Sequence, residues 1–274
     1  MKKIISDMPF EQYLAVDAAS NSILSKVRVS PAHCWEYMNR RRESTEAQVI
    51  GQAVHCLVLE PESFPSRFAE APEVDRRTKV GKDLWTEFCQ SNPGKTILKI
   101  DHANVARSVS RAILGHETAR VLLAGIHPEM SIFWDDRETQ CKARVDAWNA
   151  PLGVVCDLKT TTNASARFFE RQIIQLGYYR QAAWYMRGMR ACGLEPKSFV
   201  FIAVEKEAPF GVSLFSISRD LLSVGDDENV RLLEIFAKAK REDVWPGYPT
   251  HVQAVSVPAW MTGGNLGPDS IEEF

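Results

Sequence analysis

The sequence lacks the features that mark membrane, secreted and zinc-ribbon proteins. No apolar run approaches the roughly 18 residues of a membrane span, and the Met-Lys-Lys start lacks the long apolar region of a signal peptide. The six cysteines are scattered and form no C-x-x-C pair, which argues against zinc ribbons, iron–sulfur clusters and disulfide frameworks. We therefore expect a cytoplasmic protein whose thiols are reduced.

The chain also lacks a strong charge imbalance. It has 33 Lys and Arg against 35 Asp and Glu, a net charge of -2, so bulk charge does not make it a nucleic-acid binder. Any DNA contact must be local. One polar loop carries Arg76, Arg77 and Lys79 and is followed by Trp85 and Phe88, aromatic residues suited to packing near a DNA end. We predict these three cations as DNA contacts, although such a cluster by itself is more often solvated surface.

Length and composition predict a single folded domain. A chain of 274 residues with 45% hydrophobic and 25% charged residues can bury one sizeable core. It contains no repeat, low-complexity tract or linker that would divide it. We expect one domain over 1–274, with its core at about 45–245 and with the helices of 20–42 and the tail of 246–274 at the periphery.

The first half of the chain follows a helical period. Capping and proline signals predict short helices that begin near Asn21 and at Pro31. A helix over 45–59 has a buried apolar stripe and carries His55 on a neighbouring, more polar stripe. A further helix is expected over 103–123.

Beyond Pro128 the period changes to two residues, which predicts strands. The strand signals are separated by short turns near Asp135 and Gly153, and helical signals then return. The expected elements are strands over 130–134, 140–148 and 154–160, a long helix over 164–189, strands over 198–204 and 212–217, and a helix over 221–240.

Charged residues from two of these strands are expected to meet. Lys142, Arg144 and Asp146 share one face of a strand, and Asp157 and Lys159 share one face of the next. Consecutive strands joined by a short turn pair antiparallel, so the two aspartates converge. Two ionised carboxylates repel each other unless a divalent cation lies between them. The pattern therefore predicts a Mg²⁺ or Mn²⁺ site.

The lysine of this pattern suggests phosphate chemistry. Lys159 could hold or deprotonate a water molecule, or stabilise negative charge on a phosphate. A lone Asp-x-Lys on a strand is most often a simple salt bridge. The second aspartate, eleven positions upstream on its own amphipathic strand, favours the catalytic interpretation.

Four short motifs together carry a family resemblance: Gly51-Gln-Ala-Val-His55, Lys142-Ala-Arg-Val-Asp146, Asp157-Leu-Lys-Thr160, and Gln175 with Tyr179. In this order they resemble the PD-(D/E)xK nuclease superfamily, specifically its RecB-like exonuclease branch and the RecE-type nuclease domains (exodeoxyribonuclease VIII). The first acidic motif reads Val-Asp where Pro-Asp is usual, a variation that the superfamily allows. The resemblance runs from about Ser20 to Trp245 and implies an α/β (α+β) fold with a mixed central sheet flanked by helices.

The resemblance implies a ligand set for the metal. His55, Asp146, Asp157 and the backbone carbonyl of Leu158 would bind Mg²⁺, and Mn²⁺ would be able to substitute. A lone helical histidine is more often a core residue, and only the neighbouring motifs favour His55 as a ligand. Glu129 resembles an additional catalytic acidic residue that supports a second metal in related exonucleases.

The resemblance also implies roles on the substrate side. Lys159 would position or activate the hydrolytic water, and Gln175 and Tyr179 would hold the scissile phosphate or the lysine. We further predict that Lys142 and Arg144 contact DNA, together with the basic loop.

The implied activity is that of a double-stranded DNA exonuclease. By resemblance it would degrade one strand from 5′ to 3′, leave 3′ single-stranded tails, and act in recombination and repair with a RecT-type single-strand annealing protein. A ring-shaped homo-oligomer, a trimer or tetramer around the DNA end, is implied by the likeness to phage lambda exonuclease. A structure-specific or restriction-type endonuclease and a noncatalytic DNA-binding module remain as alternatives.

Overall fold

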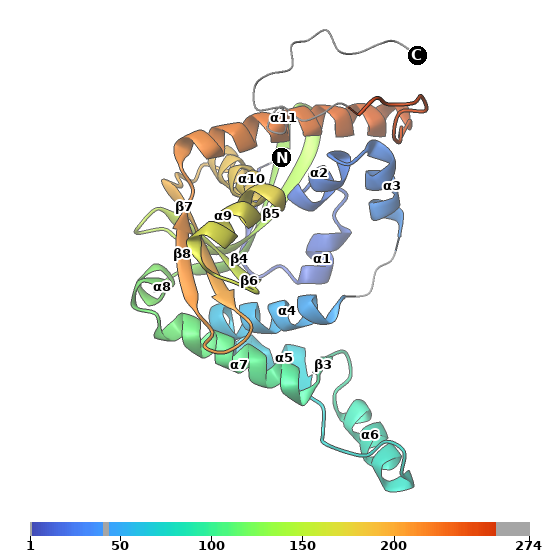
Figure 1. The fold of residues 1–274 in the computed structure, drawn as a ribbon, viewed down its shortest axis with the longest axis vertical. Helices are drawn as coiled ribbons and strands as arrows, with labels where there is room; N and C mark the ends of the chain where they lie inside the picture. The colour runs from blue at the N-terminus through green and yellow to red at the C-terminus, as the bar shows by residue number, and fades with distance from the viewer. Residues whose placement is uncertain (1, 41–43, 256–274) are drawn as a thin grey trace.

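A six-stranded mixed sheet forms the centre of the computed structural model, which describes residues 2–40 and 44–255 (Figure 1). The strand order is β1-β4-β5-β6-β7-β8, and every neighbouring pair is antiparallel except β6 and β7, which are parallel. The strands are β1 (Lys3–Ile5), β4 (His127–Asp136), β5 (Thr139–Asn149), β6 (Val154–Thr161), β7 (Ser198–Glu205) and β8 (Val212–Ser216).

Helices cover both faces of this sheet, so that the molecule has three layers (Figure 1). One hydrophobic cluster joins the sheet to α2 (Asn21–Val27), α3 (Pro31–Asn39), α9 (Ala166–Gln175), α10 (Tyr178–Ala191) and α11 (Arg219–Glu242). A second cluster joins the other face to α4 (Glu46–Leu59), α7 (Ile100–Gly115) and α8 (Glu117–Leu122). This architecture confirms the predicted fold class, and the five strands expected from the two-residue period all form.

Two helices predicted as continuous are broken. The helix expected over 103–123 divides at His116, whose extended backbone ends α7 and whose ring Nδ1 accepts a hydrogen bond from Ala119 N at the start of α8. The helix expected over 164–189 divides at Gly177, which has a left-handed φ of 71°. Hydrophobic periodicity does not reveal such a break, because the apolar pattern continues on both sides of it.

Gly177 is required where it stands. A side chain there would be strained at this φ, and a Cβ would lie only 2.1 Å from the nearest atom of the Arg180 guanidinium. The turn redirects the chain, so α9 and α10 have different axes and no longer share a helical face.

An N-terminal segment that sequence patterns did not predict covers part of the sheet. β1 pairs with β4, and α1 (Phe10–Ala15) follows it. Tyr13 of α1 packs against Phe133, so the strand face that alternation would leave polar is buried.

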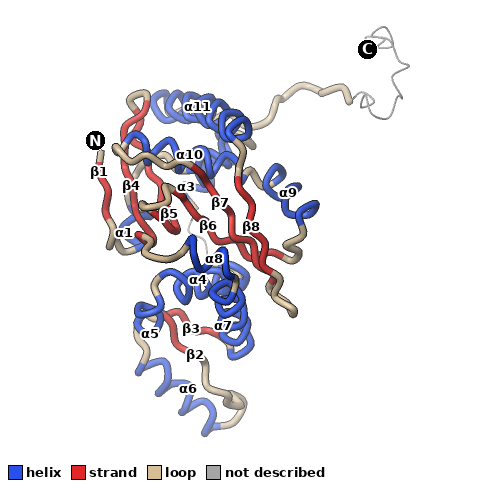
Figure 2. The backbone as a smooth tube through the Cα atoms, turned by 90° about the vertical axis from the view of Figure 1, so that its left-hand side faces the viewer, coloured by secondary structure: helices blue, strands red, loops and turns tan. Residues whose placement is uncertain are grey.

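A second unpredicted region projects away from the sheet (Figure 2). It begins after α4 and includes a small parallel pair of strands. Helix α6 forms its tip, beyond these strands. Its elements are the 3-10 turn η1 (Pro61–Ser63), α5 (Phe64–Arg67), β2 (Phe68–Glu70), α6 (Lys79–Ser91) and β3 (Thr96–Leu98).

Within the described residues, none of the helices combines the length and the apolar character that crossing a membrane requires.

Candidate active site

Three acidic residues lie in a row across three neighbouring strands. In the antiparallel pairing of β4 with β5, Pro128 pairs with Ala147 and Met130 pairs with Val145. Glu129 of β4 therefore lies opposite Asp146 of β5. The pairing of β5 with β6 ends at Ala147 and Cys156, and just beyond it Asp146 and Asp157 lie close enough for the charge of Asp157 to raise the pKa of Asp146. The structure thus brings Asp157 near Asp146, as the strand pattern predicted, and it places Glu129 beside Asp146.

The site forms where β5 separates from β6. Backbone pairing between the two strands stops at Ala147, so the edge of Leu158 that faces β5 has no strand partner there. Asp146 Oδ2 accepts a hydrogen bond of 3.0 Å from Leu158 N, and the carbonyl of the same residue lies 3.1 Å from His55 Nε2. The free backbone groups of β6 thus bind site residues from a strand and from a helix.

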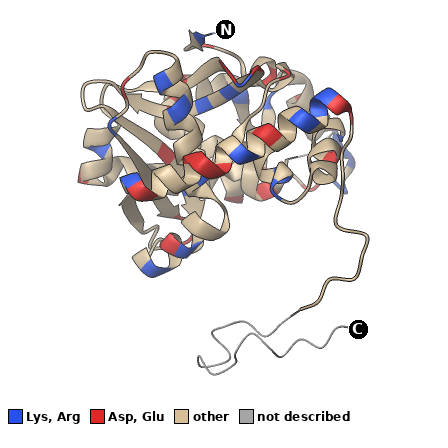
Figure 3. Cartoon of the chain, turned by 90° about the horizontal axis from the view of Figure 1, so that it is seen from above, with Lys and Arg blue, Asp and Glu red and all other residues tan. Residues whose placement is uncertain are grey.

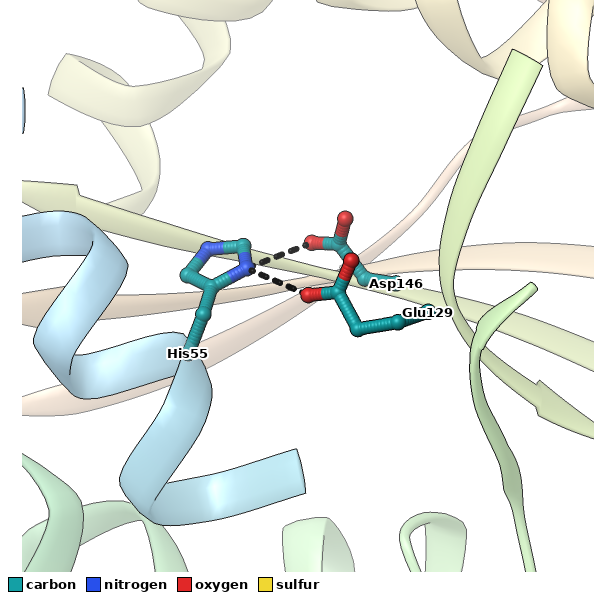
Figure 4. A group of neighbouring side chains, drawn as sticks. All are labelled: His55, Glu129 and Asp146. Atoms are coloured by element: carbon teal, nitrogen blue, oxygen red, sulfur yellow. Dashed lines mark ion pairs between the residues drawn. The ribbon is translucent and has the colours of Figure 1, made fainter. Parts of the chain in front are cut away.

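His55 reaches the sheet because α4 packs on it with a specific face. The helix starts at a capping box of Thr45 and Gln48, and it buries Ala53, Val54 and Cys56 around the half-buried histidine. Its Nδ1 lies 3.5 Å from Asp146 Oδ2 and 3.8 Å from Glu129 Oε1 (Figure 4).

Burial and nearby carboxylates shift the pKa values of Asp146, His55 and Glu129. Burial, reinforced by the charge of Asp157, raises the pKa of Asp146 to about 7. Burial opposes the charge of His55, but the carboxylates of Asp146 and Glu129 outweigh it and raise its pKa to about 9. Burial likewise opposes the charge of Glu129, while the interaction with His55 and the hydrogen bond from Arg144 hold its pKa below the usual value.

Lys159 lies beside Asp157 and near two aromatic rings. Its ammonium is paired with Asp157, and its Nζ lies 4.9 Å from the ring centroid of Tyr178 and 5.6 Å from that of Phe201. Burial opposes this charge, but the carboxylates of Asp157 and Asp146 outweigh it and hold the pKa of Lys159 above its usual value. The lysine is therefore a cation within a carboxylate cluster.

Asp157 is completely buried and is also held by α10. Gln181 Nε2 donates a hydrogen bond of 2.8 Å to Asp157 Oδ2 and lies 3.0 Å from the hydroxyl of Tyr185. Residues 178, 181 and 185 share one face of α10, and this face borders the site.

The family model for the "PDDEXK-like domain of unknown function (DUF3799)" matches residues 20–257, which is most of the chain. The protein belongs to this family. The acidic row, the Asp-x-Lys on β6 and the order of the elements are those of PD-(D/E)xK nucleases, as the resemblance implied.

One solved structure supports the fold of this PDDEXK-like domain. A crystal structure of a "putative exonuclease" from Eubacterium rectale superposes with a TM-score of 0.63 at 15% sequence identity, covering 95% of this chain and 99% of that one. The structure of a protein designated SSO0001 aligns with a TM-score of only 0.28 at 12% identity, over 83% of this chain and 88% of that one. No curated protein matches this chain.

The predicted pair of Gln175 and Tyr179 does not lie at the site of this domain. Gln175 is exposed at the end of α9, and the buried Tyr179 donates its hydroxyl to Glu228 of α11. The two residues are four apart in sequence, but the break at Gly177 removes them from a common helix face. This expectation was wrong for the same reason that the long helix was wrong.

Gln181 and Tyr185 are the residues that the sequence interpretation missed. They too are a glutamine and a tyrosine four apart, and they lie further along the chain, beyond the break. Gly177 was the available signal: a glycine within a helical pattern suggests a boundary, and a boundary there would have favoured the pair that follows it.

Lys142 and Arg144 are not placed to contact DNA. Lys142 is 5% exposed, and its ammonium donates to the carbonyls of Tyr13, Leu14 and Val16 in the N-terminal segment. Arg144 is bound to Glu129 and to the Met8 carbonyl. Both predictions were wrong because the face that strand alternation leaves open is covered by this segment.

The basic loop remains exposed and lies at the far end of the projecting region (Figure 2). Arg76 stacks over the ring of Trp85 at 4.5 Å, and Lys79 begins α6. Seen from above, acidic and basic residues are interspersed along α11 (Figure 3). Whether Arg76, Arg77 and Lys79 contact DNA stays a prediction.

The residues of the site fit a divalent cation. One ligand atom each from His55, Glu129 and Asp146 lies within 4.8 Å of the others. One imidazole nitrogen and carboxylate oxygens suit Mg²⁺ and, better still, Mn²⁺. Asp157, which was predicted as a ligand, lies outside this group of three, because Gln181 and Lys159 bind its two oxygens. Its role as a ligand stays a prediction. Leu158, expected to ligate through its carbonyl, instead lies next to the far nitrogen of His55, as a group that orients a histidine ligand does.

Proposed function

We propose that the protein is a metal-dependent exonuclease that acts on double-stranded DNA. The observation that supports it best is the buried row of Glu129, Asp146 and Asp157 with His55 on one side and Lys159 on the other. Clustered carboxylates at the separation point of two strands destabilise a fold unless a cation offsets them. His55, Arg144 and Lys159 offset part of this negative charge, and a bound divalent cation would offset the rest.

Each side chain then has a defined task. His55, Glu129, Asp146 and Asp157 would hold Mg²⁺ or Mn²⁺, which would supply Lewis-acid stabilisation of the phosphoryl and leaving oxygens when bound. Lys159, as an ammonium, would donate hydrogen bonds to the attacking water or to a phosphate oxygen and stabilise its developing charge. Gln181 and Tyr185 would hold Asp157 in place.

The direction of degradation and the assembly rest on the resemblance to RecE-type exonucleases. We propose degradation from 5′ to 3′ that leaves 3′ single-stranded tails for a RecT-type annealing protein, by a ring-shaped homo-oligomer.

Digestion of linear duplex DNA tests the proposal. The duplex is labelled at either the 5′ or the 3′ end and incubated with Mg²⁺ or with a chelator. Early release of the 5′ label as mononucleotide, with persistence of the 3′ label and no reaction in chelator, is the expected result. Early release of the 3′ label would overturn the polarity.

Two further measurements separate the alternatives. A covalently closed circular duplex should remain intact, whereas a structure-specific or restriction-type endonuclease would nick or linearise it. Calorimetric titration with Mn²⁺ should show binding, and its absence would favour a noncatalytic DNA-binding module.

A further inference from the structure

Arg144 is held firmly beside the acidic row. Its Nε donates to Glu129 Oε2 at 2.6 Å, and its Nη1 donates to the Met8 carbonyl at 2.7 Å and to Ser131 Oγ at 3.1 Å. Ser131 is its direct partner on β4, and the ring of Phe10 lies 5.8 Å from the guanidinium carbon. Only 12% of its side chain is exposed.

Glu129 presents its two oxygens to different partners. Oε2 is bound to Arg144, whereas Oε1 lies 3.8 Å from His55 Nδ1 (Figure 4). Its backbone has a positive φ of 47° within a strand, a conformation that a residue with a side chain rarely adopts. Such a conformation persists where the surroundings over-determine it, often at a functional site.

We propose that Arg144 is a positioning residue for the metal site, an inference that rests on the proposed metal-dependent function. By binding Oε2 through a charge-assisted hydrogen bond, it fixes the rotamer of Glu129 and leaves Oε1 directed at His55 and Asp146. Its positive charge also offsets part of the repulsion between the carboxylates of Glu129 and Asp146.

The N-terminal segment is the support for this arrangement. The Met8 carbonyl binds the guanidinium directly, and three further carbonyls of the segment bind Lys142, two residues along the same strand. A segment far from the acidic motifs in sequence therefore fixes the arginine that orients one of the site carboxylates.

The affinity for Mn²⁺, measured by calorimetry, tests the proposal without relying on cleavage. Arg144→Gln is expected to weaken Mn²⁺ binding by about tenfold or more, the usual effect of losing a group that orients a ligand. Arg187→Gln is the matched control, because Arg187 is also a partly buried arginine bonded to carboxylates, those of Asp136 and Asp226, outside the metal group. It should lower the melting temperature but leave the affinity unchanged.

A double-mutant cycle identifies the path of the effect. If Arg144 acts through Glu129, then Arg144→Gln should weaken binding no further in a Glu129→Gln background. An affinity of Arg144→Gln within twofold of the parent, or an equal loss in Arg187→Gln, would overturn the proposal. If Arg144→Gln does not fold, Arg144→Met, which also lacks the charge and the donors, replaces it, and parental affinity in that variant overturns the proposal. A parent that binds no Mn²⁺ would instead remove the proposed function itself.

Discussion

Lys159 has the surroundings of a charged group rather than of a free base. Two carboxylates keep its pKa high, and two aromatic rings flank its ammonium. Its contribution to hydrolysis is therefore expected to be electrostatic, through hydrogen bonds to water or phosphate.

Lys159→Ala is expected to lower the Mg²⁺-dependent cleavage rate by at least about 100-fold, because it removes this charge from the transition state. Single-turnover digestion of labelled duplex measures the rate. Circular dichroism in Mn²⁺ and a DNA-binding assay serve as controls, since fold and binding should be retained. Parental activity in Mg²⁺ would disprove the assignment.

Lys142→Met is expected to reduce the free energy of unfolding by roughly 3 kcal/mol, because one buried and two partly buried carbonyls lose their donor. Urea unfolding measures it, and Lys238→Met, at an exposed position on α11, is the control. DNA affinity of the folded variant should match the parent. A loss of affinity at unchanged stability would restore Lys142 as a DNA contact.

Mn²⁺ affinity is expected to rise with pH between about 6 and 9. A metal binds the neutral imidazole of His55 and the ionised carboxylate of Asp146, so the protons held with pKa values of about 9 and about 7 must leave on binding. Calorimetry in buffers of different ionisation enthalpy counts the released protons. An affinity independent of pH over this range would contradict these protonation states.

At the scale of elements, the break between α9 and α10 decides which side chains reach the site. Gly177 lets the chain turn, and α10 then begins with Tyr178 against Lys159 and continues with Gln181 against Asp157. The preceding helix directs its terminal glutamine to solvent.

Replacing the two glutamines tests this division. Gln181→Ala is expected to lower the cleavage rate by about tenfold or more, because Asp157 loses the donor that orients it. Gln175→Ala, at the exposed end of α9, should cleave at the parental rate and serves as the control. If only Gln175→Ala is impaired, Gln175 rather than Gln181 serves the site.

At the scale of the whole molecule, the projecting α6 region is the proposed contact with DNA, and a ring of subunits is the proposed assembly around it. Arg76, Arg77 and Lys79 are exposed in this region, and the molecule has nearly balanced charge. Any contribution of this loop to binding should therefore appear as a local electrostatic effect.

Replacing Arg76, Arg77 and Lys79 together by glutamine is expected to weaken DNA binding. The slope of log affinity against log salt concentration should fall by up to about 3, because each phosphate that is no longer neutralised contributes roughly 0.9. The cleavage rate at saturating DNA should not change. Light scattering of the same samples reports the subunit number. An unchanged salt slope would make the loop plain solvated surface, and a strictly monomeric but processive enzyme would argue against the ring.

The sequence by itself determined five strands of the central sheet and the two aspartates that lie near each other on β5 and β6. Two-residue alternation placed β4, β5 and β6, and antiparallel pairing of neighbouring strands then required Asp146 and Asp157 to meet. These features follow from local periodicity and short connections, which are properties of adjacent residues.

Only the tertiary structure decided what surrounds this row. Strand alternation states which side chains share a face but not what covers it, and here the N-terminal segment binds Lys142 and Arg144. Helical periodicity continues across a turn, so it did not distinguish Gln175 from Gln181. Contacts between distant segments depend on packing and on single backbone angles, and these are not encoded in the local pattern.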